Sequence, residues 1–223
     1  MTDNEHSPML WGSPQETGST FDFRSMLLAI ARTTLHDDVY GEDSTTRNFE
    51  EDMAKICGHE SAAFVLSGTM ANQLSLRSLL YQPPHAILAD ASAHIIHWEA
   101  GGIAHLSGAM VQGIRPMNGL YLTLDDVKKH AVITDDVHKC PTQAISIENT
   151  CSGVIIPLEE LQRIKEWASV HGIAIHMDGA RLCCDVLTVD FSKNLGAPMG
   201  AMVLGSSELI KRLRRLRKSI GAG

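Results

Sequence analysis

The sequence has no long apolar run, no excess of positive charge and no paired cysteine motif. No apolar run approaches the ~20 residues that span a bilayer, and the net charge of −7 argues against nucleic-acid or anionic-membrane partners. The five cysteines include no C-x-x-C pair, which favours free thiols over a disulfide framework or a zinc site. The polar N-terminus is not typical of a signal or transit peptide, so we expect a cytoplasmic protein.

The length of 223 residues is enough for one domain with a substantial core. Hydrophobic residues make up 44% and charged residues 20%, as in an ordinary globular protein. Residues 1–20 are polar and punctuated by Gly, Ser, Pro and Thr, so we interpret them as a flexible arm. Residues 21–223 would form the domain, and no internal repeat divides them.

The order of expected elements indicates a sheet covered by helices. The segment FDFRS at 21–25 is expected to be extended, and a helix from a Ser44 or Thr45 cap should stop at Gly58. Other expected helices cover 26–35, 71–80 and 157–170, and residues 120–131 are expected to hold the start of a strand and then a helix. The expected strands cover 62–66, 86–88, 144–148, 173–178, 186–191 and 201–204. Strands that alternate with helices predict an α/β sheet with helices on both faces.

The sequence Ser67-Gly68-Thr69 joins the apolar segment AAFVL to a helix. Such a turn directs free backbone N–H groups and the positive end of the helix dipole at one spot, which suits a phosphate. Ser and Thr are also preferred helix N-caps, so a purely structural interpretation of this turn stays open.

Asp178 ends a buried strand, and a buried acid needs a partner. An ion pair with the nearby Arg181 would satisfy it structurally. The protonated ring nitrogen of pyridoxal 5'-phosphate (PLP) is a second partner, and it would leave Arg181 free for a substrate carboxylate. A metal bound by His176, Asp178 and His171 is a third and weaker alternative.

Lys193 follows a second apolar strand and precedes a turn rich in Gly and Pro. PLP enzymes need such a lysine for a Schiff base and an acid facing the ring nitrogen, and Ser192 could donate to a phosphate oxygen. His94 and His97 lie three positions apart and would share a helix face. The ring of His94 could stack on a flat cofactor, although packing is the commoner role of such a pair.

Six ordered segments carry a family resemblance: DDVYGED, SGTMANQ, AHIIHWEAGG, ISIENT, HMDGAR and FSKNLGAPMG. Together they resemble the low-specificity threonine aldolases, members of the beta-eliminating lyase group of fold-type I PLP enzymes. The resemblance covers residues 21 to 223. It implies an α/β large domain with a mostly parallel mixed sheet, helices on both faces and PLP as the cofactor. The sequence ends where the family continues into a small C-terminal domain, which we therefore expect to be largely absent.

The resemblance also implies a role for each matching residue and a reaction. The catalytic residues would be Lys193, the Schiff-base lysine, and His94, which would stack on the ring and handle the β-hydroxyl proton. The phosphate would be held by Ser67, Gly68 and Thr69, the ring nitrogen by Asp178, and the substrate by Arg181 and Tyr40, the latter possibly from a neighbouring subunit. The reaction would be cleavage of L-threonine or L-allo-threonine to glycine and acetaldehyde in a homodimer or homotetramer.

These motifs indicate cofactor binding but do not determine which substrate bond is broken, so two alternatives remain. One is an alanine-type amino-acid racemase of the same fold. The other is a catalytically impaired, truncated paralogue that persists as a dimerising scaffold.

Asp178 and Lys193 are only 193 − 178 = 15 positions apart. Parallel neighbouring strands usually need a crossover of a dozen or more residues, and this spacing cannot hold a full crossover helix. We therefore expect a displaced or frayed second strand, a strained linkage, or a Lys193 that is not where the family's lysine lies.

Overall fold

The computed structural model describes residues 23–179, 184–193 and 197–222. The proposed arm at 1–20 lies outside these residues. The chain divides into two units, Met1–Leu35 and His36–Gly223. In the first unit, helix α1 spans Phe23–Arg32, so the expectation of an extended segment through Ser25 is wrong. The helix extends back to Phe23 because Arg, Met, Leu and Ala, all good helix formers, fill its length.

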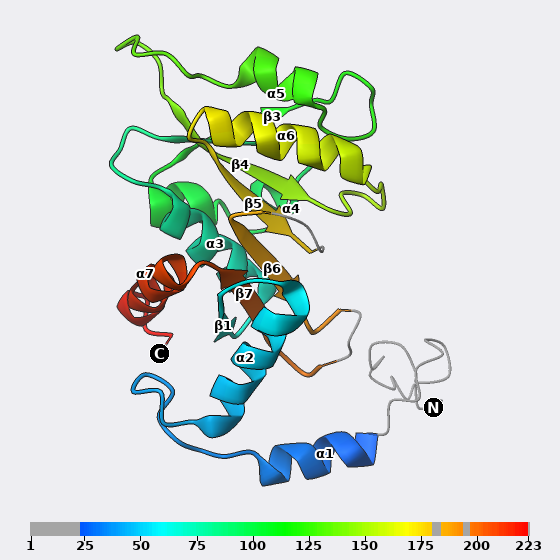
Figure 1. Ribbon diagram of the computed structural model, residues 1–223, viewed down its shortest axis with the longest axis vertical. Helices are drawn as coiled ribbons and strands as arrows, with labels where there is room; N and C mark the ends of the chain where they lie inside the picture. The colour runs from blue at the N-terminus through cyan, green and yellow to red at the C-terminus, as the bar shows by residue number, and fades with distance from the viewer. Residues whose placement is uncertain (1–22, 180–183, 194–196, 223) are drawn as a thin grey trace, which may run out of the picture. The chain divides into compact units, whose positions relative to one another are not determined.

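The second unit is built on a seven-stranded sheet with the order β1-β7-β6-β5-β4-β2-β3 (Figure 1). Strand β7 runs antiparallel to β1 and β6, and the other neighbours are parallel. The strands are β1 Ser61–Val65, β2 Ala86–Asp90, β3 Met110–Ile114, β4 Thr142–Glu148, β5 Ala174–Asp178, β6 Val186–Asp190 and β7 Ala201–Gly205. The predicted mixed, mostly parallel α/β sheet is confirmed. The sequence analysis missed β3, whose five residues lie at the sheet edge, include Gln112 and Gly113, and bury only Ile114.

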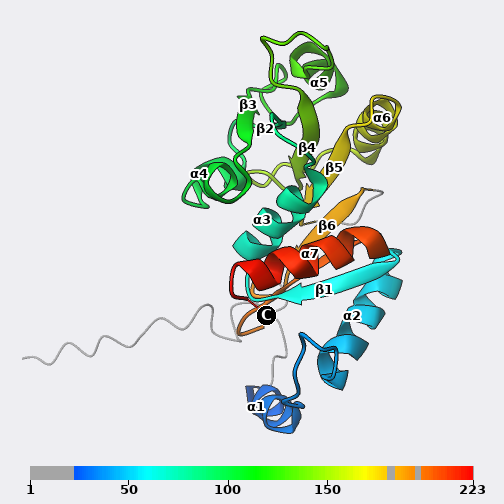
Figure 2. The ribbon, with the colours of Figure 1, turned by 90° about the vertical axis from the view of Figure 1, so that its left-hand side faces the viewer.

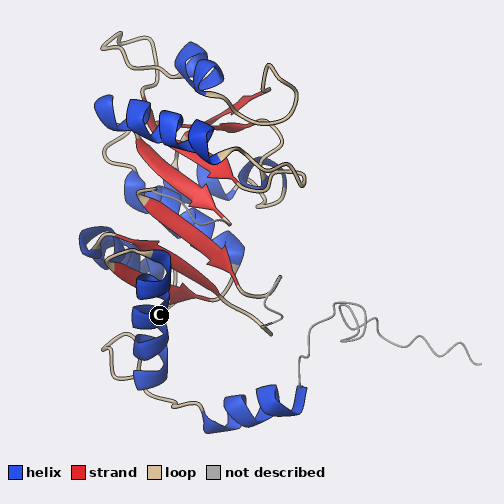
Figure 3. Cartoon of the chain, turned by 45° about the vertical axis from the view of Figure 1, so that its right-hand side comes forward, coloured by secondary structure: helices blue, strands red, loops and turns tan. Residues whose placement is uncertain are grey.

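Helices cover both faces of this sheet, as predicted (Figures 2 and 3). Helices α2 (Ser44–Cys57), α5 (Leu124–His130) and α6 (Leu158–Val170) enclose one buried cluster. Helices α3 (Gly68–Leu79), α4 (His94–His97) and α7 (Ser207–Ser219) enclose the other, together with a five-residue π-helix, η1 (Ile103–Ser107). No helix of the described residues is long and apolar enough to cross a membrane.

The buried clusters fix the positions of the strands relative to one another. Ile145 of β4, Ile175 of β5 and Ile164 of α6 are buried in one cluster, with exposures of 2% or less. Burying a side chain of this size contributes about 1.5–3 kcal/mol to folding. Because the parallel strands β4, β5 and β6 are held in register, their carboxyl ends lie along one edge of the sheet.

The caps of α2 differ in part from the prediction. Asp43, rather than Ser44 or Thr45, caps the helix, and its Oδ1 accepts a hydrogen bond from the backbone N–H of Thr46 over 2.8 Å. A carboxylate at this position also interacts favourably with the helix dipole. Gly58 ends the helix with a φ of 71°, as expected of a glycine stop.

Strands β5 and β6 are parallel neighbours despite their short connection. His176 lies opposite Val186 and Asp178 opposite Thr188, so the expectation of a displaced second strand is wrong. Residues 179 to 185 join the strands, and their length of 185 − 179 + 1 = 7 residues can span about 23 Å. A five-residue strand is only about 17 Å long, so a return without a helix is long enough. The expectation of a strained linkage falls on residues 180–183, outside the described ones.

Candidate active site

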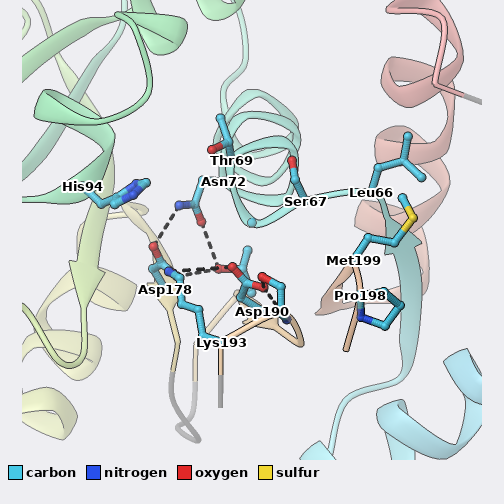
Figure 4. A pocket seen from close by; sticks show the side chains of 14 residues that line it. Leu66, Ser67, Thr69, Asn72, His94, Asp178, Asp190, Lys193, Pro198 and Met199 are labelled. Atoms are coloured by element: carbon cyan, nitrogen blue, oxygen red, sulfur yellow. Dashed lines mark hydrogen bonds and ion pairs between the residues drawn. The ribbon is translucent and has the colours of Figure 1, made fainter. Parts of the chain in front are cut away.

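A pocket of about 370 Å³ opens at the edge of the sheet where β5 and β6 end (Figure 4). Ligands of open α/β sheets bind outside the carboxyl ends of parallel strands, and this pocket has that position. The residues that line it are Leu66, Ser67, Gly68, Thr69, Asn72, His94, Asp178, Thr188, Asp190, Ser192, Lys193, Pro198, Met199 and Gly200.

The amino end of α3 forms one wall. Ser67 caps this helix, because its Oγ accepts a hydrogen bond from the backbone N–H of Met70 over 3.2 Å. The structural interpretation of the turn is therefore observed. It is compatible with anion binding, since the hydroxyl can still donate its own proton and the helix dipole favours negative charge at this end.

Asp178 lies at the opposite wall, at the end of β5. Its Oδ2 accepts from Nδ2 of Asn72 over 2.8 Å, and its Oδ1 accepts from Oγ1 of Thr188 over 3.2 Å. Both of these donors are neutral, so they orient the carboxylate without compensating its charge. The alternative ion pair with Arg181 falls outside the described residues.

Asn72 bonds to Asp178 (Figure 4) and also to a second acid, Glu99. It is 2% exposed, and Nδ2 also donates to Oε1 of the buried Glu99 over 2.9 Å. Its Oδ1 lies 3.0 Å from Oγ1 of Thr188, whose single hydroxyl proton is shared between this oxygen and Oδ1 of Asp178. The amide therefore uses both its donor and its acceptor sides to fix Asp178, Glu99 and Thr188.

His94 enters the pocket from the start of α4. Its backbone N–H donates to Oε2 of Glu148 over 2.7 Å, and its Nδ1 lies 3.0 Å from Oε1 of Glu99. Glu99 also accepts a 2.5 Å hydrogen bond from Nε2 of Gln73. Because an acceptor faces Nδ1, this nitrogen carries the proton and Nε2 is left as the basic nitrogen of the neutral ring. His97 bonds instead to the carbonyl of Ala91, so only His94 faces the pocket.

Lys193 lines the pocket with a side chain that is 66% exposed, and its Nζ lies 3.7 Å from Oδ2 of Asp190. Lys193 and Asp178 line the same pocket, and whether Lys193 takes the position of the family's lysine stays a prediction. The other carboxylate oxygen of Asp190, Oδ1, accepts from the backbone N–H and the Oγ of Ser192, over 2.9 and 2.6 Å. The hydroxyl of Ser192, expected at a phosphate, is thus bonded to Asp190.

Two buried groups shape the electrostatics around Asp178. Burial, with a smaller contribution from the nearby Asp178, raises the pKa of Glu148, and the N–H of His94 only partly opposes this. Burial lowers the pKa of His176 to about 4, against an opposing effect of Asp178. His176 is therefore neutral near pH 7, with its Nδ1 2.9 Å from Oγ of Ser146, and it offers Asp178 no positive charge.

The structure gathers most of the predicted site residues at one place. Six of them contribute to the lining of the pocket: Ser67, Gly68, Thr69, His94, Asp178 and Lys193. Tyr40 is 82% exposed and is not among the described residues that line the pocket. Arg181 lies outside the described residues. The substrate-binding roles of Tyr40 and Arg181 stay predictions.

The sequence analysis missed four residues at or behind the pocket: Asn72, Glu99, Thr188 and Asp190. Three had a readable signal, because Asn72 lies one helical turn after Gly68, and Thr188 and Asp190 share a face of β6 by strand alternation. Glu99 lies in the segment AHIIHWEAGG, but nothing there indicated its burial, which depends on contacts with Asn72 and Gln73 of α3.

The metal alternative has no geometric support. In the stretches 23–179, 184–193 and 197–222, no group of three His, Cys, Asp or Glu residues could hold a metal ion. His171 bonds through Nδ1 to the carbonyl of Trp167 at the end of α6, whereas His176 is buried beside Ser146.

Comparison with known proteins gives a consistent result. Residues 19–183 match the family model described as beta-eliminating lyase. The chain is 48% identical to an alanine racemase of Cochliobolus carbonum, over 96% of this chain and 61% of that protein. It is 42% identical to a low-specificity L-threonine aldolase of Eremothecium gossypii, over 93% of this chain and 61% of that protein.

Among solved structures, a threonine aldolase of Leishmania major shares the fold, with a TM-score of 0.75 and 24% identity. That similarity covers 88% of this chain and 63% of the other. The chain therefore spans about three fifths of the length of the curated relatives that it matches.

Proposed function

Because the chain belongs to the beta-eliminating lyase family, whose members are PLP-dependent, we propose that it is a PLP-dependent aldehyde-lyase. Its substrate would be L-threonine or L-allo-threonine, and its products glycine and acetaldehyde. One observation carries the proposal: the acid, the histidine, the lysine and the Ser67-Gly68-Thr69 turn, which are distant in sequence, line one pocket.

The residues of the pocket fit PLP. Its volume of about 370 Å³ falls in the ~300–1,000 Å³ range of small-molecule sites. The capped amino end of α3 provides hydroxyl and N–H donors at one wall, as a phosphate requires. At the other wall, Asp178 receives hydrogen bonds from the neutral donors Asn72 and Thr188, so its charge can pair with a protonated ring nitrogen.

Each pocket residue would have a distinct role. Ser67, Gly68 and Thr69 would bind the phosphate, and Asp178 would hold a proton on the ring nitrogen. Lys193 would form the covalent bond to the cofactor, and His94 would lie against the ring. When bound, PLP supplies an electron sink for the pair released from the substrate's Cα–Cβ bond.

His94 would act on the β-hydroxyl proton of the substrate. Since Glu99 accepts the proton on Nδ1, Nε2 remains free to accept the hydroxyl proton as the bond to Cβ breaks. Asn72 and Gln73 hold Glu99 in place, so the tautomer and the ring orientation of His94 are fixed by buried groups.

Other parts of the site would come from outside the described pocket. We expect Arg181 to pair with the substrate carboxylate, because a guanidinium binds a carboxylate in a bidentate way. Tyr40 would contribute from a neighbouring subunit of a homodimer or homotetramer. A cytoplasmic location also remains an expectation.

Racemisation of an amino acid such as alanine is a second candidate. The relative from Cochliobolus carbonum, named an alanine racemase, supports it. The same pocket residues serve either reaction, and the bond held perpendicular to the ring decides between them.

The proposal is tested with purified protein and added PLP. We expect the near-visible absorbance of lysine-bound PLP, its loss in Lys193→Ala, and its retention in the control Lys139→Ala, which removes an exposed lysine. L-threonine should yield acetaldehyde, whereas D-alanine from L-alanine would favour the racemase. A protein that shows neither the absorbance band nor either product, even with excess PLP, contradicts both.

A further inference from the structure

The carboxylate of Asp190 lies against the first turn of α3, where the phosphate is expected. A Cβ placed on Gly68 would lie 2.7 Å from Oδ2 of Asp190, so the carboxylate approaches the backbone of this turn directly. A larger residue at this position would force the carboxylate to move. The negative charge of Asp190 is stabilised here by the same helix end that would attract a phosphate.

Asp190 also interacts with two other groups that face the pocket. Its Oδ1 accepts from the backbone N–H and the hydroxyl of Ser192, and its Oδ2 lies 3.7 Å from Nζ of Lys193. The side chain is only 16% exposed, so water screens its charge incompletely. Asp190 thus occupies the hydrogen-bond donors of Ser192 and the charge of Lys193, which an anionic ligand bound here would also use.

We propose that Asp190 is an internal anion that competes with the phosphate of the cofactor and so weakens cofactor binding. The inference rests on the proposed function only in taking PLP as the ligand. A phosphate monoester carries a charge of about −1.5 to −2 near pH 7. Placing it beside a fixed carboxylate is unfavourable, so Asp190 must turn away before the phosphate can use the α3 end and the Ser192 hydroxyl.

The competition predicts an effect that depends on the phosphate. Pyridoxal has the same ring and aldehyde as PLP but lacks the phosphate. It would meet Lys193, Asp178 and His94 without displacing Asp190. Neutralising Asp190 should therefore strengthen the binding of PLP while changing the binding of pyridoxal little.

The experiment measures dissociation constants of PLP and pyridoxal, by fluorescence quenching, for the wild type, Asp190→Asn and Asp190→Ser. We expect each variant to bind PLP about tenfold more tightly, since removing one close like charge is worth at least that much at low exposure. Asn at this position can still accept the hydrogen bonds of Ser192, and the serine variant provides a second measurement if the amide disturbs folding. Thermal melting checks that both are folded.

Asp52→Asn is the matched control, because it removes the same charge from an exposed site on α2, where the side chain of Asp52 is 69% accessible. It should leave both dissociation constants unchanged. An equal gain in affinity for PLP and pyridoxal would overturn the proposal. The substitution would then act on Lys193, which both ligands contact, and not on the phosphate. Unchanged or weaker PLP binding in the Asp190 variants would also overturn it.

The remaining outcomes separate this inference from the proposed function. If the variants bind PLP more tightly but release no acetaldehyde from L-threonine, the role of Asp190 stands and the aldolase assignment fails. If wild type and variants all fail to bind PLP, both fail.

Discussion

Asn72 and Asp178, 106 positions apart in the sequence, are joined by a 2.8 Å hydrogen bond that fixes the acid at the wall of the pocket. The same amide nitrogen donates to Glu99, which in turn accepts from His94. The acid expected at the ring nitrogen and the histidine expected over the ring are therefore oriented by one buried side chain.

Replacing Asn72 by Ala should disturb both ends of this arrangement. Buried Glu99 and Thr188 would each lose a partner, and we expect the free energy of unfolding to fall by about 1–3 kcal/mol. PLP affinity should fall roughly tenfold, the equivalent of ~1.4 kcal/mol, because Asp178 is no longer held. Urea titration and PLP titration measure the two effects. Asn48→Ala, at an exposed position of α2, should change neither; equal behaviour of the two variants would contradict the role of Asn72.

A pair of substitutions at His94 should separate stacking from proton transfer. His94→Phe keeps a flat ring but has no basic nitrogen, so acetaldehyde formation should fall by about 10²–10⁴-fold while PLP affinity changes little. His94→Ala should lose activity and also bind PLP more weakly. The measurements are steady-state rates with L-threonine and PLP titrations. Full activity of the phenylalanine variant would rule out His94 as the base.

Ser67 should serve both the helix and the cofactor. Ser67→Ala removes the cap of α3, and Ser206→Ala removes the matching cap of α7, where Oγ accepts from the N–H of Leu209. Each should lower the free energy of unfolding by about 0.5–2 kcal/mol. Only Ser67→Ala should also weaken PLP binding. Equal PLP affinities in the two variants would show that Ser67 is a cap alone.

His176 should make the stability of the protein depend on pH. Its pKa is lowered from 6.5 to about 4 in the folded state, so the unfolded chain binds more protons between these values. The stabilisation is complete above pH 6.5 and is lost as pH falls toward 4, by at most about 1.4 kcal/mol per pH unit. Denaturant titrations between pH 4 and 7 measure this slope.

The matched variants are His176→Gln, which should reduce the slope, and His105→Gln, at an exposed position of η1, which should not. Burial raises the pKa values of Glu50 and Glu148. These two carboxyls therefore make the folded state more stable as pH falls, which opposes the effect of His176. Their contribution is the same in all three proteins and cancels in the comparison. A slope unchanged by His176→Gln would contradict the assignment.

Much of the site could be read from the sequence because its residues lie at the ends of apolar segments. The strand ending at Asp178 and the turn at Ser67-Gly68-Thr69 are local patterns, and in the structure both line the pocket. The ends of helices were less predictable, because a cap depends on a single hydrogen bond. At the start of α2, Asp43 accepts the hydrogen bond from the N–H of Thr46, whereas Ser44 or Thr45 was expected as the cap. Edge strand β3 was missed because its five residues, MVQGI, do not alternate between apolar and polar side chains.

By itself, the sequence determined the α/β class and the family, and it supplied the residue types that a PLP pocket would need, because these depend on local patterns in fixed order. Only the tertiary structure decided that β5 and β6 pair in parallel across a short connection, which brings Lys193 into the pocket with Asp178. It also decided that Asn72 links Asp178 to Glu99 and that Asp190 lies at the α3 end. These contacts join residues from separate elements, and they form only when the helices pack on the sheet.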